Sequence, residues 1–245
     1  MNLIEVDEAT STNTLAASMP DAPHGTVIRA VAQTAGRGQR GNSWESEPGK
    51  NLTVSIVVRP ENISAGDQFL ICRAVSVALV QLLDRVLPQS LEAEIKWPND
   101  IYVGDKKICG ILIENSLTGS TIDRSILGIG LNVNQRDFVS DVPNPVSIIN
   151  LNGGVEIELA PLVEMLWSLV DENLRLCSTE SGRQKLTENY NSRLWRRHGY
   201  HTFALPGGER FEALIKSIGD NGVMTLEHRD GATQSFAFKE VQFVL

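Results

Sequence analysis

The sequence predicts an α+β fold in two parts, and three patterns carry that prediction. Residues Asn51–Val58 alternate apolar side chains with smaller or polar ones, which is the period of a β-strand. Residues Phe69–Leu87 and Leu159–Leu176 repeat apolar side chains at helical spacing. After about residue 192, short extended runs alternate with Gly and Asp turns, which favours a small antiparallel barrel. We therefore expect one domain over residues 1–192 and a second over residues 193–245.

The first part should contain further strands around its two helices. The helix that begins at Phe69 is expected to stop near Pro88, because proline cannot continue a helix. Turn residues at Asn99-Asp100 and Gly104-Asp105 divide the next stretch into short strands, and the later helix should cover the sheet. The expected strands are Glu94–Trp97, Ile101–Val103, Ile108–Glu114 and Arg124–Asn132 in the first part, then Gly199–Leu205, Arg210–Ile218, Gly222–His228 and Ala232–Phe238 in the second.

The composition is that of an ordinary globular protein, with 42% hydrophobic and 21% charged residues. A net charge of -8 at pH 7 opposes a nucleic-acid partner, which would demand a basic face. Cys72, Cys109 and Cys177 form no CxxC pair, so reduced thiols in the cytoplasm are expected. No signal peptide is expected, and no apolar stretch reaches the roughly 20 residues of a membrane span. The four histidines show no ligand spacing, so no protein-bound metal is expected.

The glycine-rich segment Gly36–Gly41, GRGQRG, is a candidate anion-binding loop. Its glycines let main-chain N–H groups approach an anion closely, and Arg37 and Arg40 add charge-assisted hydrogen bonds. It is neither a P-loop nor a dinucleotide fingerprint, because GxxxxGK[ST] and a GxGxxG between strand and helix are both missing. Taken alone, the segment is equally compatible with a surface hairpin whose arginines are solvated.

A second polar segment, Lys96–Asp100 (KWPND), is followed by Lys107 on the next expected strand. If the turn at Gly104-Asp105 closes a hairpin, Asp100 and Lys107 return close to each other. A lysine in that place could reach both an attacking carboxylate and an α-phosphate. The residues by themselves also allow Lys96, Lys106 and Lys107 to be solvated charges of a hairpin.

These two segments, followed by Gly128–Asn134 (GIGLNVN), resemble the catalytic domain of biotin protein ligases. The resemblance covers nearly the whole chain. It implies a mixed sheet packed with helices, similar to class II aminoacyl-tRNA synthetases, over residues 1–192, and an SH3-like barrel over residues 193–245. The helix-turn-helix domain of the family members that also act as repressors has no counterpart, so a ligase-only type is expected.

The resemblance also implies roles for individual residues. Lys107 and Arg37 would be catalytic, stabilising charge on the reacting phosphate. Ser11 and Gln33 would hydrogen-bond the ureido ring of biotin, because a buried polar ring needs fixed hydrogen-bond partners. The implied biotin-binding residues are Ser11, Thr12, Asn13, Gln33, Gly36, Arg37, Gly38, Trp44, Lys107, Gly110 and Leu112. The implied ATP- or adenylate-binding residues are Arg37, Arg40, Asn99, Asp100, Lys107, Asn132 and Ser147.

Some of these residues also allow a purely structural interpretation. Ser11 has the pattern of a helix N-cap, which is compatible with a second role in binding. Gly128–Asn134 could be a strand that ends in a tight turn, and Trp97 is expected in the core. Two departures from the family pattern stand out: Gln39 and Asn42 replace arginines, and residues 239–245 contain no arginine to reach a nucleotide.

The implied activity is ATP-dependent biotin protein ligation with biotin, ATP and Mg²⁺, the metal arriving on the ATP phosphates. The implied partner is a biotin carboxyl carrier protein domain, and the chain would be a monomer or a homodimer. Lipoate ligase or octanoyl transferase, which share the catalytic fold, is an alternative enzyme class. A non-catalytic biotin sensor is an alternative from another class, which the retained Lys107 opposes.

Overall fold

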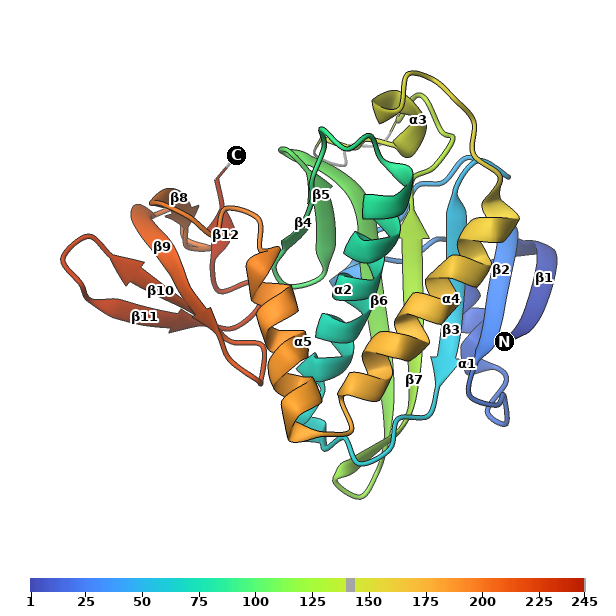
Figure 1. Ribbon diagram of the computed structural model, residues 1–245, viewed down its shortest axis with the longest axis horizontal. Coiled ribbons are helices and arrows are strands. Elements are labelled where there is room, and N and C mark those ends of the chain that lie inside the picture. Colours follow the sequence, from blue (N-terminus) through green and yellow to red (C-terminus); the bar gives the residue numbers. More distant parts are fainter. Residues whose placement is uncertain (140–143, 245) are drawn as a thin grey trace.

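A seven-stranded sheet and a five-stranded sheet form the framework of the protein in the computed structural model (Figure 1). The structure describes residues 1–139 and 144–244, apart from the side chain of Arg40. The two sheets lie in the N-terminal and C-terminal parts of the chain, as the change of pattern near residue 192 predicts. None of the helices in this described part is long and apolar enough to cross a membrane.

The large sheet has the strand order β1-β2-β3-β7-β6-β5-β4. Strands β1 and β2 are parallel, and every other neighbouring pair is antiparallel, so the predicted mixed sheet is confirmed. The strands expected between residues 94 and 132 are all present, and β6 is longer than expected. Their bounds are β1 (Asn2–Ala9), β2 (Thr26–Gln33), β3 (Leu52–Val58), β4 (Ala93–Lys96), β5 (Asp100–Val103), β6 (Lys106–Thr118) and β7 (Thr121–Leu131).

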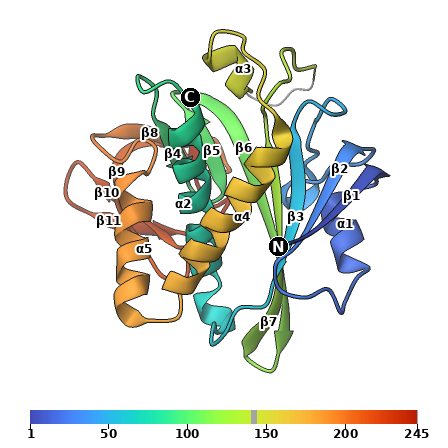
Figure 2. The same ribbon diagram turned by 45° about the vertical axis from the view of Figure 1, so that its right-hand side comes forward.

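Helices cover both faces of this sheet (Figures 1 and 2). On one face lie α2 (Phe69–Val86) and α4 (Leu159–Leu176), both predicted, with α5 (Glu180–Ser192) beside α2. On the other face lies the short helix α1 (Thr12–Ala17), against β2, β3 and β7. All seven residues of β3 are buried, because the strand lies between β2 and β7 with α1 on one face and α4 on the other.

Shorter helical segments complete the first part of the chain. A 3₁₀ turn at Gln39–Gly41 lies inside the glycine-rich segment, and another at Ala65–Asp67 precedes α2. Helix α3 (Ile148–Leu151) follows β7. Helix α5 was not expected from the sequence, because only Gly182, Leu186 and Tyr190 of it are buried and apolar spacing is therefore weak.

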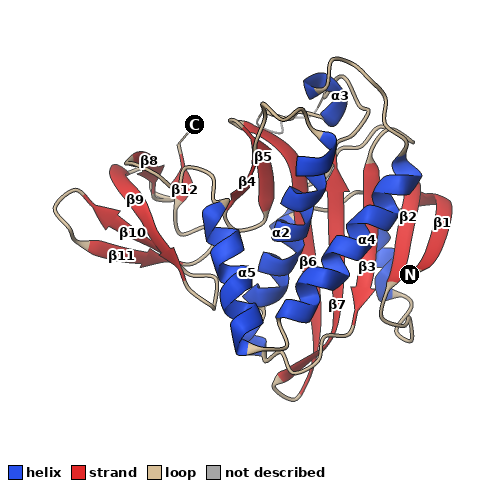
Figure 3. Cartoon of the chain, viewed as in Figure 1, coloured by secondary structure: helices blue, strands red, loops and turns tan. Residues whose placement is uncertain are grey.

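The small sheet is antiparallel throughout, with the order β11-β10-β9-β8-β12 (Figure 3). Four of its strands fall in the four runs expected from the Gly and Asp turns, whereas the two-residue β12 was not expected. The strands are β8 (His201–Ala204), β9 (Arg210–Ile218), β10 (Met224–His228), β11 (Thr233–Phe236) and β12 (Gln242–Phe243).

Two buried side chains join the small sheet to the first part of the chain. Trp97, which is in the core as expected, donates its indole N–H to the carbonyl of Gly222 at 2.9 Å. The fully buried Arg73 of α2 donates to the carbonyls of Ile218 and Gly219 and pairs with Asp220 at 2.7 Å. These contacts hold the β9–β10 turn against α2 and the β4–β5 hairpin, beside the candidate site.

Candidate active site

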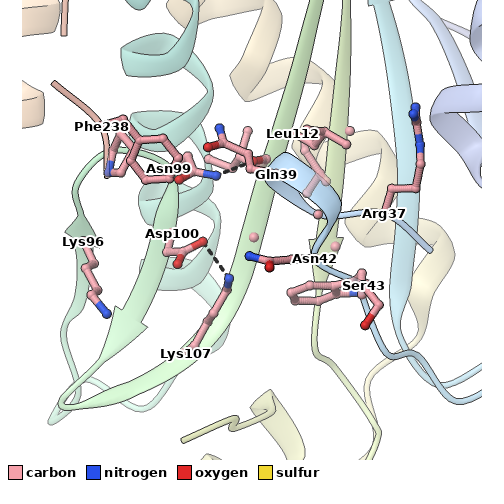
Figure 4. Close-up of a pocket in the computed structure, with 18 of the residues that line it drawn as sticks. Arg37, Gln39, Asn42, Ser43, Lys96, Asn99, Asp100, Lys107, Leu112 and Phe238 are labelled. Carbon is pink, nitrogen blue, oxygen red and sulfur yellow. Dashed lines mark hydrogen bonds and ion pairs between the residues drawn. The ribbon is translucent and has the colours of Figure 1, made fainter. Parts of the chain in front are cut away.

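A cavity of about 990 Å³ lies where the face of the large sheet that carries α1 meets the small sheet. Lining side chains come from the start of α1, the glycine-rich segment, the β4–β5 hairpin, β6, β7 and the turn before β12. Most residues that the sequence predicts for the site lie around it (Figure 4). Those lining it are Ser11, Thr12, Asn13, Gln33, Arg37, Gly38, Trp44, Asn99, Asp100, Lys107, Gly110 and Leu112.

A buried polar cluster occupies the α1 side of the cavity. Ser11 is the N-cap of α1, as predicted, and its hydroxyl accepts from the backbone N–H of Thr14 at 3.1 Å. The Thr12 N–H donates to Gln33 Oε1 at 2.8 Å, and the hydroxyl of Ser55 donates to Asn13 Oδ1 at 2.6 Å. The bond from Thr12 orients the Gln33 amide, whose Nε2 has no hydrogen-bond partner among the described residues.

Trp44 lies flat on the middle of the cavity floor. A Cβ atom at Gly130 would come 2.3 Å from the Trp44 indole, and one at Gly110 would come 3.0 Å from it. Glycine at these two strand positions therefore makes room for the aromatic ring. The Trp44 indole N–H is buried and has no hydrogen-bond partner among the described residues.

Lys107 and Asp100 form an ion pair of 2.7 Å beyond Trp44, which confirms the juxtaposition expected from the hairpin (Figure 4). Their side chains are 21% and 24% exposed, so the pair lies partly inside the cavity wall. The backbone of Lys107 is held by the segment before α3: its N–H donates to Asn144 and its carbonyl accepts from Val146. The buried Asn99 donates its amide to the Ile111 carbonyl at 2.6 Å.

Arg37 does not lie beside Lys107 in the structure. Its guanidinium donates to both carboxylate oxygens of Glu114, at 2.9 and 3.0 Å. Figure 4 shows Arg37 on the opposite side of the cavity from Lys107 and Asp100. Asn13 donates to the same Glu114 carboxylate at 2.7 Å, so Arg37 is joined to the α1 side of the site. A change of side-chain conformation would be needed to bring Arg37 and Lys107 onto one phosphate.

Four predicted site residues are not part of the described lining. Gly36 lies behind Trp44, whose carbonyl oxygen would be 2.5 Å from a Cβ at this position. Asn132 is buried and donates to the carbonyl of Val146 at 3.0 Å, while its Oδ1 has no partner among the described residues. Ser147 is buried and donates to the Gln135 carbonyl. The side chain of Arg40 lies outside the described residues.

Sequence reasoning missed Lys96 and Glu114 as members of this region. The KWPND segment that contains Lys96 is expected in the site, but no role is predicted for Lys96 itself, which is half-buried and lines the cavity. Its cross-strand pairing with Asp100 around Pro98 and Asn99 was a signal that could have identified it. Glu114 gives no comparable signal, because its contact with Arg37 joins positions 77 residues apart.

The cysteines offer no nucleophile to this site. Burial raises the pKa of the Cys72 thiol to about 12 and that of the Cys177 thiol to about 11, and it raises the pKa of Cys109 further. Such thiols remain protonated near pH 7 and are unreactive. Within the described residues, no group of three His, Cys, Asp or Glu side chains is placed to hold a metal ion.

Comparison with known proteins identifies relatives over nearly the whole chain. A model of the biotin/lipoate A/B protein ligase family matches residues 3–132. The bifunctional ligase/repressor BirA of Bacillus subtilis is 29% identical over 247 residues, which cover 96% of this chain and 72% of the relative. Biotin--[acetyl-CoA-carboxylase] ligase of Mycobacterium tuberculosis is 27% identical over 207 residues, covering 83% and 73%.

Solved structures show the same architecture. Biotin protein ligase from Aquifex aeolicus, in complex with biotin and ATP, aligns with a TM-score of 0.79 at 22% identity, covering 99% of both chains. The enzyme from Leishmania major, in complex with biotinyl-5-AMP, aligns with a TM-score of 0.60 at 26% identity, covering 96% of this chain and 98% of the other. More than half of this chain matches the family model. The chain therefore belongs to the biotin/lipoate A/B protein ligase family and is a ligase of the biotin protein ligase type.

Proposed function

We propose that the protein forms biotinyl-5′-AMP from biotin and MgATP and then transfers biotin to a lysine of a biotin carboxyl carrier protein domain. The observation that carries this proposal is a single cavity with three regions. It runs from the polar cluster at α1, past the indole ring of Trp44, to Lys107. A neutral ring with polar edges, an apolar tail and a carboxylate would fit these three regions in that order. The Leishmania major relative, solved in complex with biotinyl-5-AMP, supports an adenylate as the ligand.

Biotin would bind with its ureido ring at Ser11, Thr12, Asn13 and Gln33. The free Nε2 of Gln33 and the Ser11 hydroxyl are donors of the kind that a ureido carbonyl needs. Trp44 would contact the aliphatic tail, since an indole ring supplies a large apolar surface. This placement brings the carboxylate of biotin toward Lys107.

In the first half-reaction, a carboxylate oxygen of biotin attacks the α-phosphorus of ATP. A new oxygen–phosphorus bond forms, the bond to the bridging oxygen breaks, and pyrophosphate leaves with the electron pair. Lys107 would stabilise the charge that develops on the α-phosphate, and Arg37 would join it after release from Glu114. The metal carried by ATP neutralises charge on the departing pyrophosphate.

In the second half-reaction, the amine of the acceptor lysine attacks the carbonyl carbon of the mixed anhydride. The amide bond forms, the carbon–oxygen bond breaks so that AMP leaves with the electron pair, and the attacking amine loses one proton and keeps the other as the amide N–H. No side chain of the ligase forms a covalent intermediate in this scheme. The glycine-rich segment, with Arg37 and Arg40, would close over the adenylate and keep water from the anhydride.

The proposed acceptor is the carrier domain of a biotin-dependent carboxylase, in line with the acetyl-CoA-carboxylase named for the Mycobacterium tuberculosis relative. We also propose that the protein works in the cytoplasm, because its three cysteines are unpaired. It would act as a monomer or as a homodimer.

The test is biotin-dependent exchange of labelled pyrophosphate into ATP, followed by transfer of labelled biotin to a purified carrier domain. We expect exchange that depends on biotin and that a tenfold excess of lipoate leaves unchanged. Exchange driven by lipoate would assign the chain to the lipoate branch of the family. Exchange without transfer to any carrier lysine would contradict the second half-reaction.

A further inference from the structure

Lys96 at the end of β4 lies in an unusual environment for a lysine. Its ammonium donates to the hydroxyl of Tyr102 at 2.8 Å and lies 4.4 Å from the centre of the Tyr102 ring. The rings of Trp195 and Phe243 have their centres 5.4 and 6.0 Å away. These three residues form an aromatic box around the ammonium, a setting in which ring quadrupoles stabilise a cation.

The positive charge in the aromatic box has no anionic partner among the described residues. Lys96 forms no ion pair with a carboxylate there, whereas Arg37 and Lys107 of the same cavity pair with Glu114 and Asp100. Burial lowers the pKa of the Lys96 ammonium from its usual value, and the charges of Lys107 and Arg196 lower it further, against the effect of Asp100. A partly desolvated cation without a counter-ion is an incomplete site, which an anion would complete.

The aromatic box opens onto the same cavity as Lys107. Lys96, Tyr102 and Phe243 all line it. Lys96 is paired in register with Asp100 across the β4–β5 hairpin. The carboxylate of Asp100 forms its ion pair with Lys107. In the view of Figure 4, Asp100 lies between Lys96 and Lys107. Lys96 is therefore the next cation along the cavity, beyond the lysine assigned to the α-phosphate.

We propose that Lys96 binds the pyrophosphate portion of ATP and holds it as the leaving group in adenylate formation. This assignment rests on the proposed function, and it gives the polyphosphate a site in the cavity distinct from that of biotin. When the bond to the α-phosphorus breaks, its electron pair passes to the bridging oxygen of pyrophosphate. Lys96 would stabilise that charge from the side opposite biotin, while Lys107 remains with the α-phosphate.

The two half-reactions separate this role from a structural one, because only the first involves pyrophosphate. The test variant is Lys96→Met, and the matched control is Lys106→Met, which removes an exposed lysine from the same hairpin region. We expect Lys96→Met to lower biotin-dependent exchange at least tenfold, mainly through a higher KM for MgATP. Its transfer of biotin from chemically prepared biotinyl-5′-AMP should stay within twofold of wild type, and Lys106→Met should behave as wild type in both assays.

Calorimetric titration with inorganic pyrophosphate measures the contact without any turnover. We expect the Kd for pyrophosphate to rise at least tenfold in Lys96→Met and to be largely restored in Lys96→Arg. An unchanged Kd in Lys96→Met would overturn the proposal. So would a parallel loss of exchange and of transfer from preformed adenylate, because that result means that Lys96 only maintains the structure.

A measurement on the wild-type protein covers the case in which Lys96→Met does not fold. Acetylation of lysines by an amine-reactive ester is followed by peptide mass spectrometry, with and without inorganic pyrophosphate. Pyrophosphate should slow modification of Lys96 at least fivefold and leave Lys106 and Lys216 unaffected; equal rates at Lys96 would contradict the proposal. If wild type shows no biotin-dependent exchange, the proposed function fails, whereas normal exchange with an unprotected Lys96 removes only this inference.

Discussion

The carboxylate of Asp100 positions the Lys107 side chain in the site. The ion pair of 2.7 Å with Asp100 restrains a flexible side chain, and the backbone pairing with residues 144–146 fixes the strand beneath it. An ammonium restrained in this way can meet a phosphate at little further cost in conformational entropy. Position as well as charge therefore distinguishes Lys107 from its exposed neighbour Lys106.

Replacing Lys107 by Ala should leave the fold intact and lower adenylate formation at least tenfold. A tenfold loss corresponds to about 1.4 kcal/mol of transition-state stabilisation, a modest value for a charge on a reacting phosphate. Biotin-dependent pyrophosphate exchange measures the effect, with Lys106→Ala as the control. Exchange at the wild-type rate in Lys107→Ala would remove Lys107 from the mechanism.

The ion pair of Arg37 with Glu114 keeps Arg37 away from a bound phosphate. Arg37 must leave Glu114 before it can reach a phosphate, and ion pairs as exposed as this one are worth up to about 1 kcal/mol. Glu114→Gln should therefore raise the affinity for biotinyl-5′-AMP, by up to about fivefold, as measured by equilibrium dialysis. Asp123→Asn, which breaks another exposed pair with Arg59, is the control. Weaker binding in Glu114→Gln would mean that Glu114 positions Arg37 instead of holding it back.

The residue pattern by itself predicts the pair whose members are close along the chain, and the family resemblance supplies most of the other predicted site residues. The turn at Gly104-Asp105 is enough to predict that Asp100 meets Lys107, because a hairpin brings both strands back together. The contact of Arg37 with Glu114 and the aromatic box around Lys96 depend on how distant elements pack. No local pattern specifies such contacts.

At the scale of elements, the cavity floor depends on strands β6 and β7 being free of side chains beneath Trp44. Gly130→Ala would place a methyl group 2.3 Å from the Trp44 indole. The indole ring must then move, and the segment that contains Trp44 must move with it. We expect biotin affinity to fall at least tenfold, with little change in thermal stability because this segment lies at the surface. Titration calorimetry measures the affinity, and Gly207→Ala, whose Cβ would meet nothing within 4 Å, is the control. Unchanged affinity in Gly130→Ala would separate Trp44 from biotin binding.

The elements differ in how well the sequence predicts them, for a physical reason. Helix α4 was expected over the residues that it occupies, because its apolar stripe faces the sheet and is regular along its length. Helix α5 has a mostly polar sequence, and only a narrow strip of it packs against α2 and α4. The strand β12 has two residues and is formed only by pairing with β8. Tertiary packing decides elements of that kind.

For the whole molecule, the relation between the two sheets determines the shape of the cavity. Phe238, Lys239 and Gln242 from the small sheet line it together with residues of the large sheet. Arg73 joins the two sheets. Its guanidinium donates hydrogen bonds to Thr187 of α5 and to three successive residues, Ile218 to Asp220, at the β9–β10 turn. These hydrogen bonds offset the cost of burying an arginine with no exposed surface, although its Nε–H has no partner among the described residues.

Arg73→Met should weaken the junction between the two sheets. The change leaves the carbonyl of Ile218 without the Arg73 donor, whereas the Gly219 carbonyl still accepts from the Gly222 N–H, and a buried group left unpaired costs about 1–3 kcal/mol. We expect the free energy of unfolding in urea to fall by roughly 1–3 kcal/mol. Arg175→Met, which removes an exposed pair with Asp171 on one helix, should leave the midpoint unchanged. Equal midpoints for Arg73→Met and wild type would show that other contacts hold the sheets together.

The mass of the ligand formed on the protein distinguishes a biotin ligase from a lipoate ligase. The purified protein would be incubated with MgATP and an equimolar mixture of biotin and lipoate, and the bound small molecule would be identified by mass spectrometry after denaturation. We expect biotinyl-5′-AMP, with no lipoyl adenylate. A lipoyl adenylate, or no adenylate at all, would contradict this expectation.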